Sequence, residues 1–500
     1  MRLMGLDVGS TGVKAIVFTP EGEIVGSAYR EYPEVYPHPG RIELRPDDVW
    51  AGVRAVIREA AQEAGGGVRS LAISALGEAF TPVSRDGRFL HNTIVSPDTR
   101  ATAQTEELRE KLGEERVFHL TGMPLSPSFT LPKLMWMRDE MPAVHEKTWK
   151  YLLWPDTIHL KLGLTPRIDH SLAGRTMAFH VHSRGWSAEM LEASGIDQEM
   201  LADPIGPGEI VGELSADAAR EVGIEPGCVV VSGGHDQPMN ALGAGVVKPG
   251  MCVDGMGTVE CITVAFDEPV LTDAMREHNY GCYPHVVRDQ YATIAYNYAC
   301  GSLLRWWRDL FGAEEIAEAR RRGVDVWDVI VSGLPEGPSG LLWLPYFAGS
   351  GTPWLDPRAK GAIIGLTLDT DRKRLVKALI EGTCYELDLN IRALEEAGVS
   401  INRLRATGGG SRSDTWLQLK ADITGKPVVR LNISESGCQA GAILGGVALG
   451  VWNDVREATD ALVSEGEEFE PRPQMREQYA KLRETYARTW PALREIAHRL

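Results

Sequence analysis

The stretch "LMGLDVGSTGVKAIVFTPEGEIVGSAYREY", residues 3–32, decides the fold class of this chain. It contains three apolar runs, Leu3–Val8, Val13–Phe18 and Ile24–Tyr29, separated by the turn Gly9–Gly12 and by "PEGE". Short glycine-containing turns between apolar runs favour antiparallel strand pairing. The chain is therefore expected to begin with a three-stranded β-meander.

The segment after the meander predicts a helix and then another buried strand. In "RPDDVWAGVRAVIREAAQEAG", residues 45–65, either Asp47 or Asp48 is expected to cap the helix, and Gly65 is expected to end it. Its apolar residues at helical spacing are Trp50, Val53, Ile57 and Ala61. The following "VRSLAISAL" is typical of a buried strand, so the arrangement is α/β.

The middle of the chain repeats the opening pattern. "VDGMGTVECITV" has the layout of "LDVGSTGVKAIV": a strand, a glycine turn and a second strand. This similarity suggests two structurally related halves with a break near Gly243–Gly250. We place the two domains at residues 1–245 and 246–500. Further helices are expected at 302–311, at 372–397 and, charged and on the outside, at 474–498.

Composition limits the classes of function. The 500 residues carry a formal net charge of −17, which disfavours nucleic acid and anionic membranes as partners. The seven cysteines form no CxxC pair, so we expect reduced thiols and a cytoplasmic protein. No signal peptide is apparent, and the apolar run 440–452 is shorter than a membrane span of about 18 residues.

Three glycine turns each follow a predicted strand. In "GLDVGSTGVK" the small residues let backbone N–H groups approach a phosphate, Ser10 and Thr11 add hydroxyl donors, and Lys14 adds a charge. Asp7, at the end of its strand, is suited to hold Mg²⁺ through water. An ordinary hairpin turn is the alternative.

The other two turns are "DGMGTVE", residues 254–260, and "ATGGGSRSDTW", residues 406–416. Phosphate binding by the turn at 254–260 is favoured when that turn is considered together with the first turn, because two facing loops can hold a triphosphate. The turn at 406–416 lies between a strand and a helix, where an anionic or flat ligand can rest on the backbone. A hairpin and a tight strand–helix connection are the respective alternatives.

The segment "GGHDQ", residues 233–237, carries the candidate base. Asp236 follows a strand and can accept a hydroxyl proton as that oxygen attacks phosphorus, while Gln237 can bond a neighbouring hydroxyl. A helix N-cap is the alternative for Asp236, and the two roles are compatible. His235 can line the pocket, although a satisfied core histidine is the interpretation we favour.

With these motifs in place, the chain resembles the FGGY family of carbohydrate kinases over residues 2–453. The segments that carry the resemblance are "LDVGSTGVKA", "SFTLPKLMWMRDE" with Lys133 and Trp136, "GGHDQ", "GMGTVE", "KGAIIGLTLDTDRKRLVKALIEG" and "TGGGSRSDTWLQLKADITGKPV". The fifth segment departs from the family signature at Arg374 and Leu379.

The resemblance implies two ribonuclease-H-like, actin-like ATPase domains with ATP and Mg²⁺ in the cleft between them. It implies that Asp236 is the general base and that Asp7, together with Asp236, serves the metal. The expected nucleotide-binding residues are Ser10, Thr11, Lys14, Gly257, Thr258, Gly301, Gly409, Gly410, Ser411 and Asp414.

The expected sugar-binding residues are Gly77, Glu78, Asp98, His235 and Gln237. Glycerol kinases have Arg-Glu where this chain has Gly77-Glu78, so Glu78 has no arginine beside it in the sequence, and the glycine is expected to make room for something bulkier than glycerol. A solvated loop acid is the alternative for Glu78. Asp98 matches a family acid, but Ser96 replaces the usual tryptophan.

The expected activity is ATP-dependent phosphorylation of a terminal hydroxyl on a small carbohydrate, for which we favour a pentulose such as xylulose. A polyol or aldonate substrate stays open, as does a homodimer. Two alternatives of other kinds are a non-catalytic sugar or ATP sensor and a phosphatase or hydrolase, because fold alone does not set function.

Overall fold

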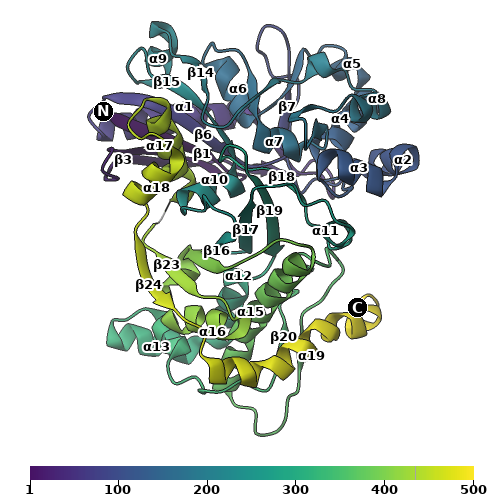
Figure 1. Ribbon diagram of the computed structural model, residues 1–500, viewed down its shortest axis with the longest axis vertical. Coiled ribbons are helices and arrows are strands. Elements are labelled where there is room, and N and C mark those ends of the chain that lie inside the picture. Colours follow the sequence, from purple (N-terminus) through teal and green to yellow (C-terminus); the bar gives the residue numbers. More distant parts are fainter. Residues whose placement is uncertain (434) are drawn as a thin grey trace.

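The computed structural model describes residues 1–433 and 435–500 and contains two large mixed sheets (Figure 1). The first sheet has the order β14-β15-β6-β1-β2-β3. Its strands are β1 (Arg2–Val8), β2 (Gly12–Phe18), β3 (Ile24–Glu31), β6 (Val68–Ala75), β14 (Ile210–Glu213) and β15 (Val229–His235). The antiparallel pairs β1–β2 and β2–β3 confirm the predicted meander.

Helix α1 (Pro46–Glu63) covers one face of the meander. All four residues predicted for its apolar face are buried. The predicted cap is wrong, because Arg45 occupies the N-cap position without a side-chain bond and Pro46 is the first helical residue. Proline suits that position since it has no N–H to leave unpaired, and Asp47 and Asp48 lie inside the first turn.

A second, smaller layer, called the inserted layer, is formed mostly by the chain between β6 and β14, with β4 (Glu34–Val35) and β5 (Glu43–Leu44) contributed from before α1. It includes a five-stranded sheet of β4, β5, β8 (Thr93–Ile94), β7 (Phe80–Val83) and β9 (Lys150–Leu153). Its helices are α2 (Thr102–Leu112), α3 (Glu114–Thr121), α4 (Thr130–Glu140), α5 (Pro142–His145), α6 (Trp154–Lys161), α7 (His170–Arg175) and α8 (Ala188–Ser194). The short strands β10 (Arg167–Asp169) and β13 (Asp203–Ile205) pair with each other, as do β11 (Phe179–His180) and β12 (Gly185–Trp186). Helix α9 (Ala216–Val222) precedes β15 and packs against α1.

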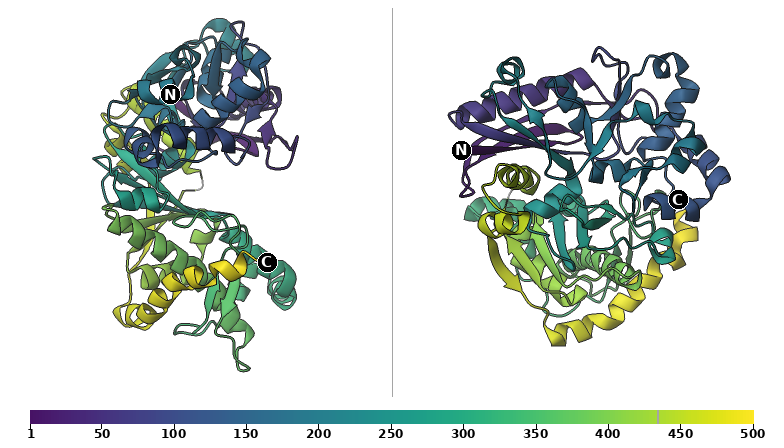
Figure 2. Two further views of the ribbon diagram at one scale, coloured as in Figure 1. Left: turned by 90° about the vertical axis from the view of Figure 1, so that its right-hand side faces the viewer. Right: turned by 45° about the horizontal axis from the view of Figure 1, so that its top comes forward.

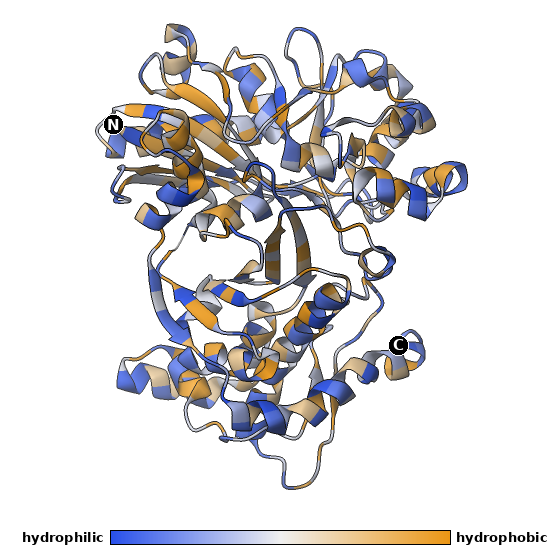
Figure 3. Cartoon of the chain, in the orientation of Figure 1, coloured by the Kyte–Doolittle hydropathy of each residue, from blue (hydrophilic) through white to orange (hydrophobic). Residues whose placement is uncertain are grey.

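The second large sheet has the order β18-β19-β17-β16-β22-β23-β24. Its strands are β16 (Met251–Met256), β17 (Glu260–Phe266), β18 (Tyr283–Pro284), β19 (Tyr291–Asn297), β22 (Arg403–Thr407), β23 (Val428–Leu431) and β24 (Glu465–Phe469). Its hydrophobic residues concentrate in the inner strands, whereas the edge strand β24 is hydrophilic (Figure 3). The β16–β17 hairpin confirms the predicted repeat of strand, glycine turn and strand.

Helices cover the second sheet and place its loops. They are α11 (Asp273–Glu277), α12 (Gly301–Phe311), α13 (Ala313–Arg322), α14 (Val326–Val331), α15 (Arg372–Glu396), α16 (Asp414–Thr424) and α19 (Pro473–Ala497), with a hairpin of β20 (Leu342–Leu344) and β21 (Ala362–Ile364). The C-terminal helix α19 lies at the periphery of this half (Figure 2), with Tyr479, Tyr486 and Trp490 buried against the core. Among the described residues, no helix combines the length and the apolar character that a membrane crossing requires.

The chain crosses back between the halves near its end. Helices α17 (Ser436–Ala448) and α18 (Val455–Leu462) follow β23, yet α17 packs on β1, β6 and α10 (Asp236–Gly243) of the first half (Figure 1). An added Cβ at Gly5 would lie 1.9 Å from the backbone oxygen of Cys438, so only glycine permits this approach. The apolar run 440–452 is therefore largely a buried helix and its connection on the first sheet.

Candidate active site

Parallel strand ends bring two carboxylates to one edge of the first sheet. Strands β1 and β15 both run parallel to β6, and the register places Asp7 beside Ser74 and Ser74 beside Gly234. Asp236 follows one residue beyond β15, at the start of α10 (Asp236–Gly243). The hydroxyl of Ser74 donates to Oδ1 of Asp7 over 2.6 Å. Asp7 and Asp236, predicted from separate motifs, thus share the same edge.

Asp236 occupies the first helical position of α10, and His235 occupies the N-cap. The expectation that Asp236 caps the helix is therefore off by one residue. The carboxylate still lies at the positive end of the helix dipole. Burial, followed by the negative charges of Asp7 and Glu78, raises the pKa of Asp236 to about 7, against the opposing influence of Arg175. A carboxylate with this pKa is a competent proton acceptor near neutral pH.

Glu78 forms an ion pair with Arg175, the last residue of α7. The Arg175 guanidinium lies 5.1 Å from the ring centroid of Phe129 and 5.2 Å from that of Tyr283. Glu78 therefore has an arginine partner, although no arginine stands next to it in the sequence. Its side chain is buried, so Glu78 is not a solvated loop acid. Sequence reasoning missed Arg175 because its partner comes from a distant segment, and no local motif signals the pair.

The side chain of His235 fills the space beside Gly77. A Cβ at residue 77 would lie 2.7 Å from Nε2 and 2.9 Å from Cδ2 of His235. The imidazole therefore occupies the space that a side chain at residue 77 would enter, and the role expected for Gly77 toward a bulkier sugar stays a prediction. His235 is buried, its Nδ1 lies 3.1 Å from the hydroxyl of Tyr283, and burial holds its pKa well below the usual range. This matches the favoured interpretation of a satisfied core histidine.

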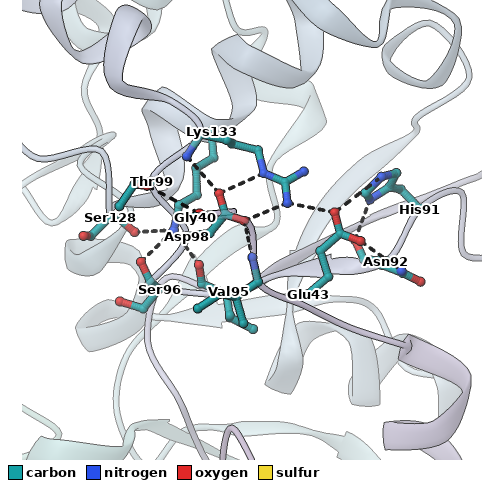
Figure 4. Close-up of polar contacts among 12 residues, drawn as sticks. Gly40, Glu43, His91, Asn92, Val95, Ser96, Asp98, Thr99, Ser128 and Lys133 are labelled. Atoms are coloured by element: carbon teal, nitrogen blue, oxygen red, sulfur yellow. Dashed lines mark hydrogen bonds and ion pairs between the residues drawn. The ribbon is translucent and has the colours of Figure 1, made fainter. Parts of the chain in front are cut away.

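Asp98 is engaged within a buried polar cluster of the inserted layer (Figure 4). Its Oδ1 accepts from the backbone N–H and Nε of Arg100, and its Oδ2 accepts from Nη2 of Arg100 and the backbone N–H of Ile42. Four bonds fill the lone pairs of a carboxylate. We therefore assign Asp98 to holding the 96–100 turn, in place of the expected contact with sugar.

Lys133, from the "SFTLPKLMWMRDE" signature, belongs to the same cluster (Figure 4). Its Nζ donates to the carbonyl oxygens of Val95 at 2.7 Å, Ser96 at 3.1 Å and Ser128 at 2.6 Å, which uses all three donors. Burial lowers the pKa of Lys133 to about 7. The guanidinium of Arg100 packs 4.8 Å from the ring centroid of Trp136. These signature residues therefore hold the segment 95–100 in place.

The first glycine turn presents exposed hydroxyls. Gly9 N–H donates to the Gly12 carbonyl over 2.9 Å, and Ser10 and Thr11 are exposed at the tip. Lys14 forms a 2.6 Å ion pair with Glu435 just before α17, so its charge is shared with a carboxylate.

The second and third glycine turns meet at an edge of the second sheet. Strands β16 and β22 are parallel, with Gly255 beside Thr407, so the turns that follow them are neighbours. Gly301 donates from its N–H to the carbonyl of Gly257 over 3.0 Å, and Arg305 donates to Oγ1 of Thr258 over 2.9 Å. The structure thus brings together the predicted nucleotide-binding residues Gly257, Thr258, Gly301, Gly409, Gly410 and Ser411.

Asp414 begins α16 directly after the third turn. Its carboxylate forms an ion pair with Arg430, and its side chain is 68% exposed. This placement leaves it accessible at the edge that carries the second and third turns.

A buried ionic triad lies beneath these two turns. Lys420 of α16 pairs with Asp254 and Glu260, which flank the second turn, and all three side chains are buried. Although burial opposes it, the two carboxylates raise the pKa of Lys420 above its usual value. Sequence reasoning missed this triad, although an Asp and a Glu bracketing one glycine turn were a usable signal.

Comparison with known proteins places this architecture among phosphotransferases that act on carbohydrates. The N-terminal domain of the FGGY family of carbohydrate kinases matches residues 2–243, and the C-terminal domain of that family matches residues 255–449. The chain therefore belongs to the FGGY family and is an ATP-dependent carbohydrate kinase with the two-domain, actin-like ATPase fold. The resemblance noted in the sequence is confirmed.

Relatives of different substrate names align over nearly the whole chain. The xylulose kinase of Bacillus subtilis (strain 168) is 26% identical over 99% of this chain and 97% of its own length. The gluconokinase of the same organism is 29% identical over 92% of this chain and 90% of its own length. The crystal structure of xylulose kinase from Rhodospirillum rubrum superposes with a TM-score of 0.89 at 27% identity, covering 100% of both chains.

Proposed function

We propose that this kinase transfers the γ-phosphoryl group of ATP to a terminal hydroxyl of a pentulose such as xylulose, with Asp236 as the general base. The observation that carries the proposal is the Asp236 carboxylate, with a pKa of about 7, beside Asp7 at the edge of the first sheet. The named xylulose kinases among the relatives support a pentulose. The gluconokinases among the relatives leave an aldonate as an alternative substrate, and the glycerol kinases leave a polyol.

The chemical step follows from the position of Asp236. The substrate hydroxyl oxygen forms a bond to the γ-phosphorus, its proton passes to Asp236, and the bond between that phosphorus and the β–γ bridging oxygen breaks to release ADP. Phosphoryl transfer has a loose transition state, so positioning of the hydroxyl matters more than early proton removal. The raised pKa lets Asp236 take the proton and return it to solvent near neutral pH.

The predicted nucleotide residues fit phosphate and nucleoside binding by their placement. The hydroxyls of Ser10 and Thr11 are exposed on the first turn, and Lys14 is half-buried at its side. The second and third turns present backbone at glycines, where N–H groups can approach phosphate oxygens closely. We assign Asp414 to a ribose hydroxyl, which its exposed position at the start of α16 supports.

The edge of the first sheet that carries Asp7 and Asp236, which we call the acidic edge, also fits Mg²⁺. Burial and the charge of Glu435 raise the pKa of Asp7, and Asp7 in turn raises the pKa of Asp236, so these carboxylates lack a full counter-charge. No group of three or more His, Cys, Asp or Glu side chains in the described part of the chain is arranged to hold a metal by itself. Mg²⁺ is commonly held by one or two carboxylates together with phosphates. Asp7 and Asp236 would hold it, and bound Mg²⁺ would neutralise charge on the transferring phosphoryl group.

We also propose a cellular compartment and an assembly state for the enzyme. We place it in the cytoplasm, where thiols stay reduced, because all seven cysteines are free and six of them are buried. A homodimer is the assembly that we propose.

A coupled ADP-release assay over a panel of carbohydrates tests the function. The panel contains ketopentoses, polyols and aldonates, each with ATP and Mg²⁺. We expect ADP release that depends on the carbohydrate and is fastest with a ketopentose. ADP release that is indifferent to every carbohydrate would contradict the proposal and favour a hydrolase, whereas a preference for an aldonate or polyol would overturn the choice of a pentulose.

A further inference from the structure

Three buried polar atoms at the acidic edge make no hydrogen bond within the described residues: Oδ1 of Asp236, Nε of Arg175 and Oε1 of Glu78. Oε1 of Glu78 is in ion-pair contact with Nη2 of Arg175, so Oδ1 of Asp236 and Nε of Arg175 are the two that lack a partner. Oδ1 of Asp236 lies 3.1 Å from Nε2 of His235 without hydrogen-bond geometry. A buried polar atom without a partner is unfavourable, because it has lost its hydrogen bonds to water and gained none. One unpaired acceptor and one unpaired donor therefore indicate a ligand that supplies the complementary groups.

The guanidinium of Arg175 is held in one orientation. Its Nη2 points to Oε1 of Glu78, and the rings of Phe129 and Tyr283 lie 5.1 Å and 5.2 Å from it. Phe129 precedes α4, whereas Tyr283 belongs to the edge strand β18 of the second sheet. With Nη2 engaged, the Nε–H remains as a donor fixed by its surroundings.

The positive charge of Arg175 is already balanced by a carboxylate of the protein. Glu78 neutralises Arg175, and Asp7 and Asp236 add negative charge. The other two buried cations of this half are occupied, since Lys133 bonds three carbonyl oxygens and Arg100 pairs with Asp98 and Glu43. A carboxylate on the substrate would therefore find no cationic side chain left to pair with it, whereas a neutral oxygen needs none.

We propose that Glu78 and Arg175 form a charge-balanced specificity pair that selects neutral sugars over aldonates. The hydroxyl to be phosphorylated donates to Asp236, and Nε–H of Arg175 donates to a neutral carbonyl or hydroxyl oxygen of the same molecule. The inference rests on the kinase function proposed above and narrows its substrate class to neutral ketoses and polyols.

The test compares three five-carbon substrates: xylitol, D-xylulose, which has a carbonyl at C2 in place of the hydroxyl, and D-xylonate, which has a carboxylate at C1 in place of the hydroxymethyl group. For the wild-type enzyme we expect kcat/KM for D-xylonate to be at least tenfold below that for D-xylulose. Glu78→Gln leaves Arg175 with an unbalanced positive charge, so the ratio of xylonate to xylulose kcat/KM should rise at least tenfold, or about 1.4 kcal/mol. Arg175→Gln leaves Glu78 unbalanced, so the same ratio should fall.

Three controls separate specificity from folding. Glu78→Asp keeps the charge and should leave the ratio near the wild-type value. Glu189→Gln removes one partner of the exposed Arg116–Glu189 pair and should change neither the ratio nor kcat. Thermal unfolding reports whether each variant is folded, and because the two charge-changing variants shift the ratio in opposite directions, either one alone decides the matter.

The outcomes distinguish the two proposals. Sugar-dependent activity with a wild-type preference for xylonate would overturn the specificity pair and leave the kinase function standing. A ratio that does not move in folded Glu78→Gln or Arg175→Gln would do the same. A wild-type enzyme that phosphorylates none of these three substrates, nor any other carbohydrate tested, would overturn the proposed function and the pair with it.

Discussion

Substitution of Gly77 by alanine should displace His235 and slow phosphoryl transfer. The added methyl group would lie 2.7 Å from Nε2 and 2.9 Å from Cδ2 of the imidazole, and carbon contacts are relaxed only at about 3.5–4.0 Å. The ring must therefore move by several tenths of an ångström or more. It has little freedom to do so, because its backbone N–H bonds Oγ of Ser171 at 2.9 Å and its Nδ1 lies 3.1 Å from the hydroxyl of Tyr283.

The magnitude follows from overpacking and from misplacement of the base. Inserting a methyl group into a packed site costs about 1–3 kcal/mol. His235 is adjacent to Asp236, and a displacement of about 1 Å at a reacting group can cost about 10²-fold in rate. We expect Gly77→Ala to lower kcat by about 10- to 100-fold. In the His235→Ala background the clash is gone. Adding Gly77→Ala there should therefore lower kcat by less than it does in the wild-type enzyme.

The assay is coupled ADP release with the preferred sugar at saturating ATP, with kcat and KM determined separately and folding checked by thermal unfolding. If Gly77 instead provides space for the sugar, Gly77→Ala should raise KM with kcat unchanged, and removal of His235 should bring no recovery. That pattern would refute the assignment of the space beside residue 77 to His235.

Two further predictions concern the charged groups. Because the proton acceptor must be ionised and the pKa of Asp236 is about 7, kcat/KM should be constant above pH 8 and fall about tenfold per unit below about pH 6; a flat profile from pH 5.5 to 8 would contradict this. Lys420→Met leaves Asp254 and Glu260 as buried unpaired carboxylates and should lower the free energy of unfolding by about 3–5 kcal/mol in urea titrations, whereas Lys426→Met, which removes a partly exposed pair with Glu395, should cost less than about 1 kcal/mol. Equal losses in Lys420→Met and Lys426→Met would contradict the role given to the triad.

Local patterns predicted much of the fold. The meander at residues 3–32 and the β16–β17 hairpin follow from apolar runs broken by glycine turns, and both formed as expected. Helix α1 was predicted, but its start was not, since Pro46 defines the first turn more strongly than the acids after it. These features depend on residues that are close together in the sequence, so one sequence is enough to predict them.

Features that depend on distant contacts were not predicted. The Glu78–Arg175 pair and the Lys420 triad join segments far apart in the chain, and the imidazole beside Gly77 comes from β15. The return of α17 to the first sheet likewise depends on close backbone approach at Gly5, which is visible only once both segments are placed. The positions of Asp7 and Asp236 could be predicted because Asp7 lies near the end of β1 and Asp236 directly follows β15, each within a recognisable motif.

The most direct measurement compares wild-type enzyme with Asp236→Asn, which keeps the size of the side chain and removes its basicity. We expect sugar-dependent ADP release to fall by at least 10²- to 10³-fold, while ATP binding, measured by calorimetry without Mg²⁺, stays within about twofold. Near-normal phosphorylation by folded Asp236→Asn would contradict the assignment of this carboxylate as the base.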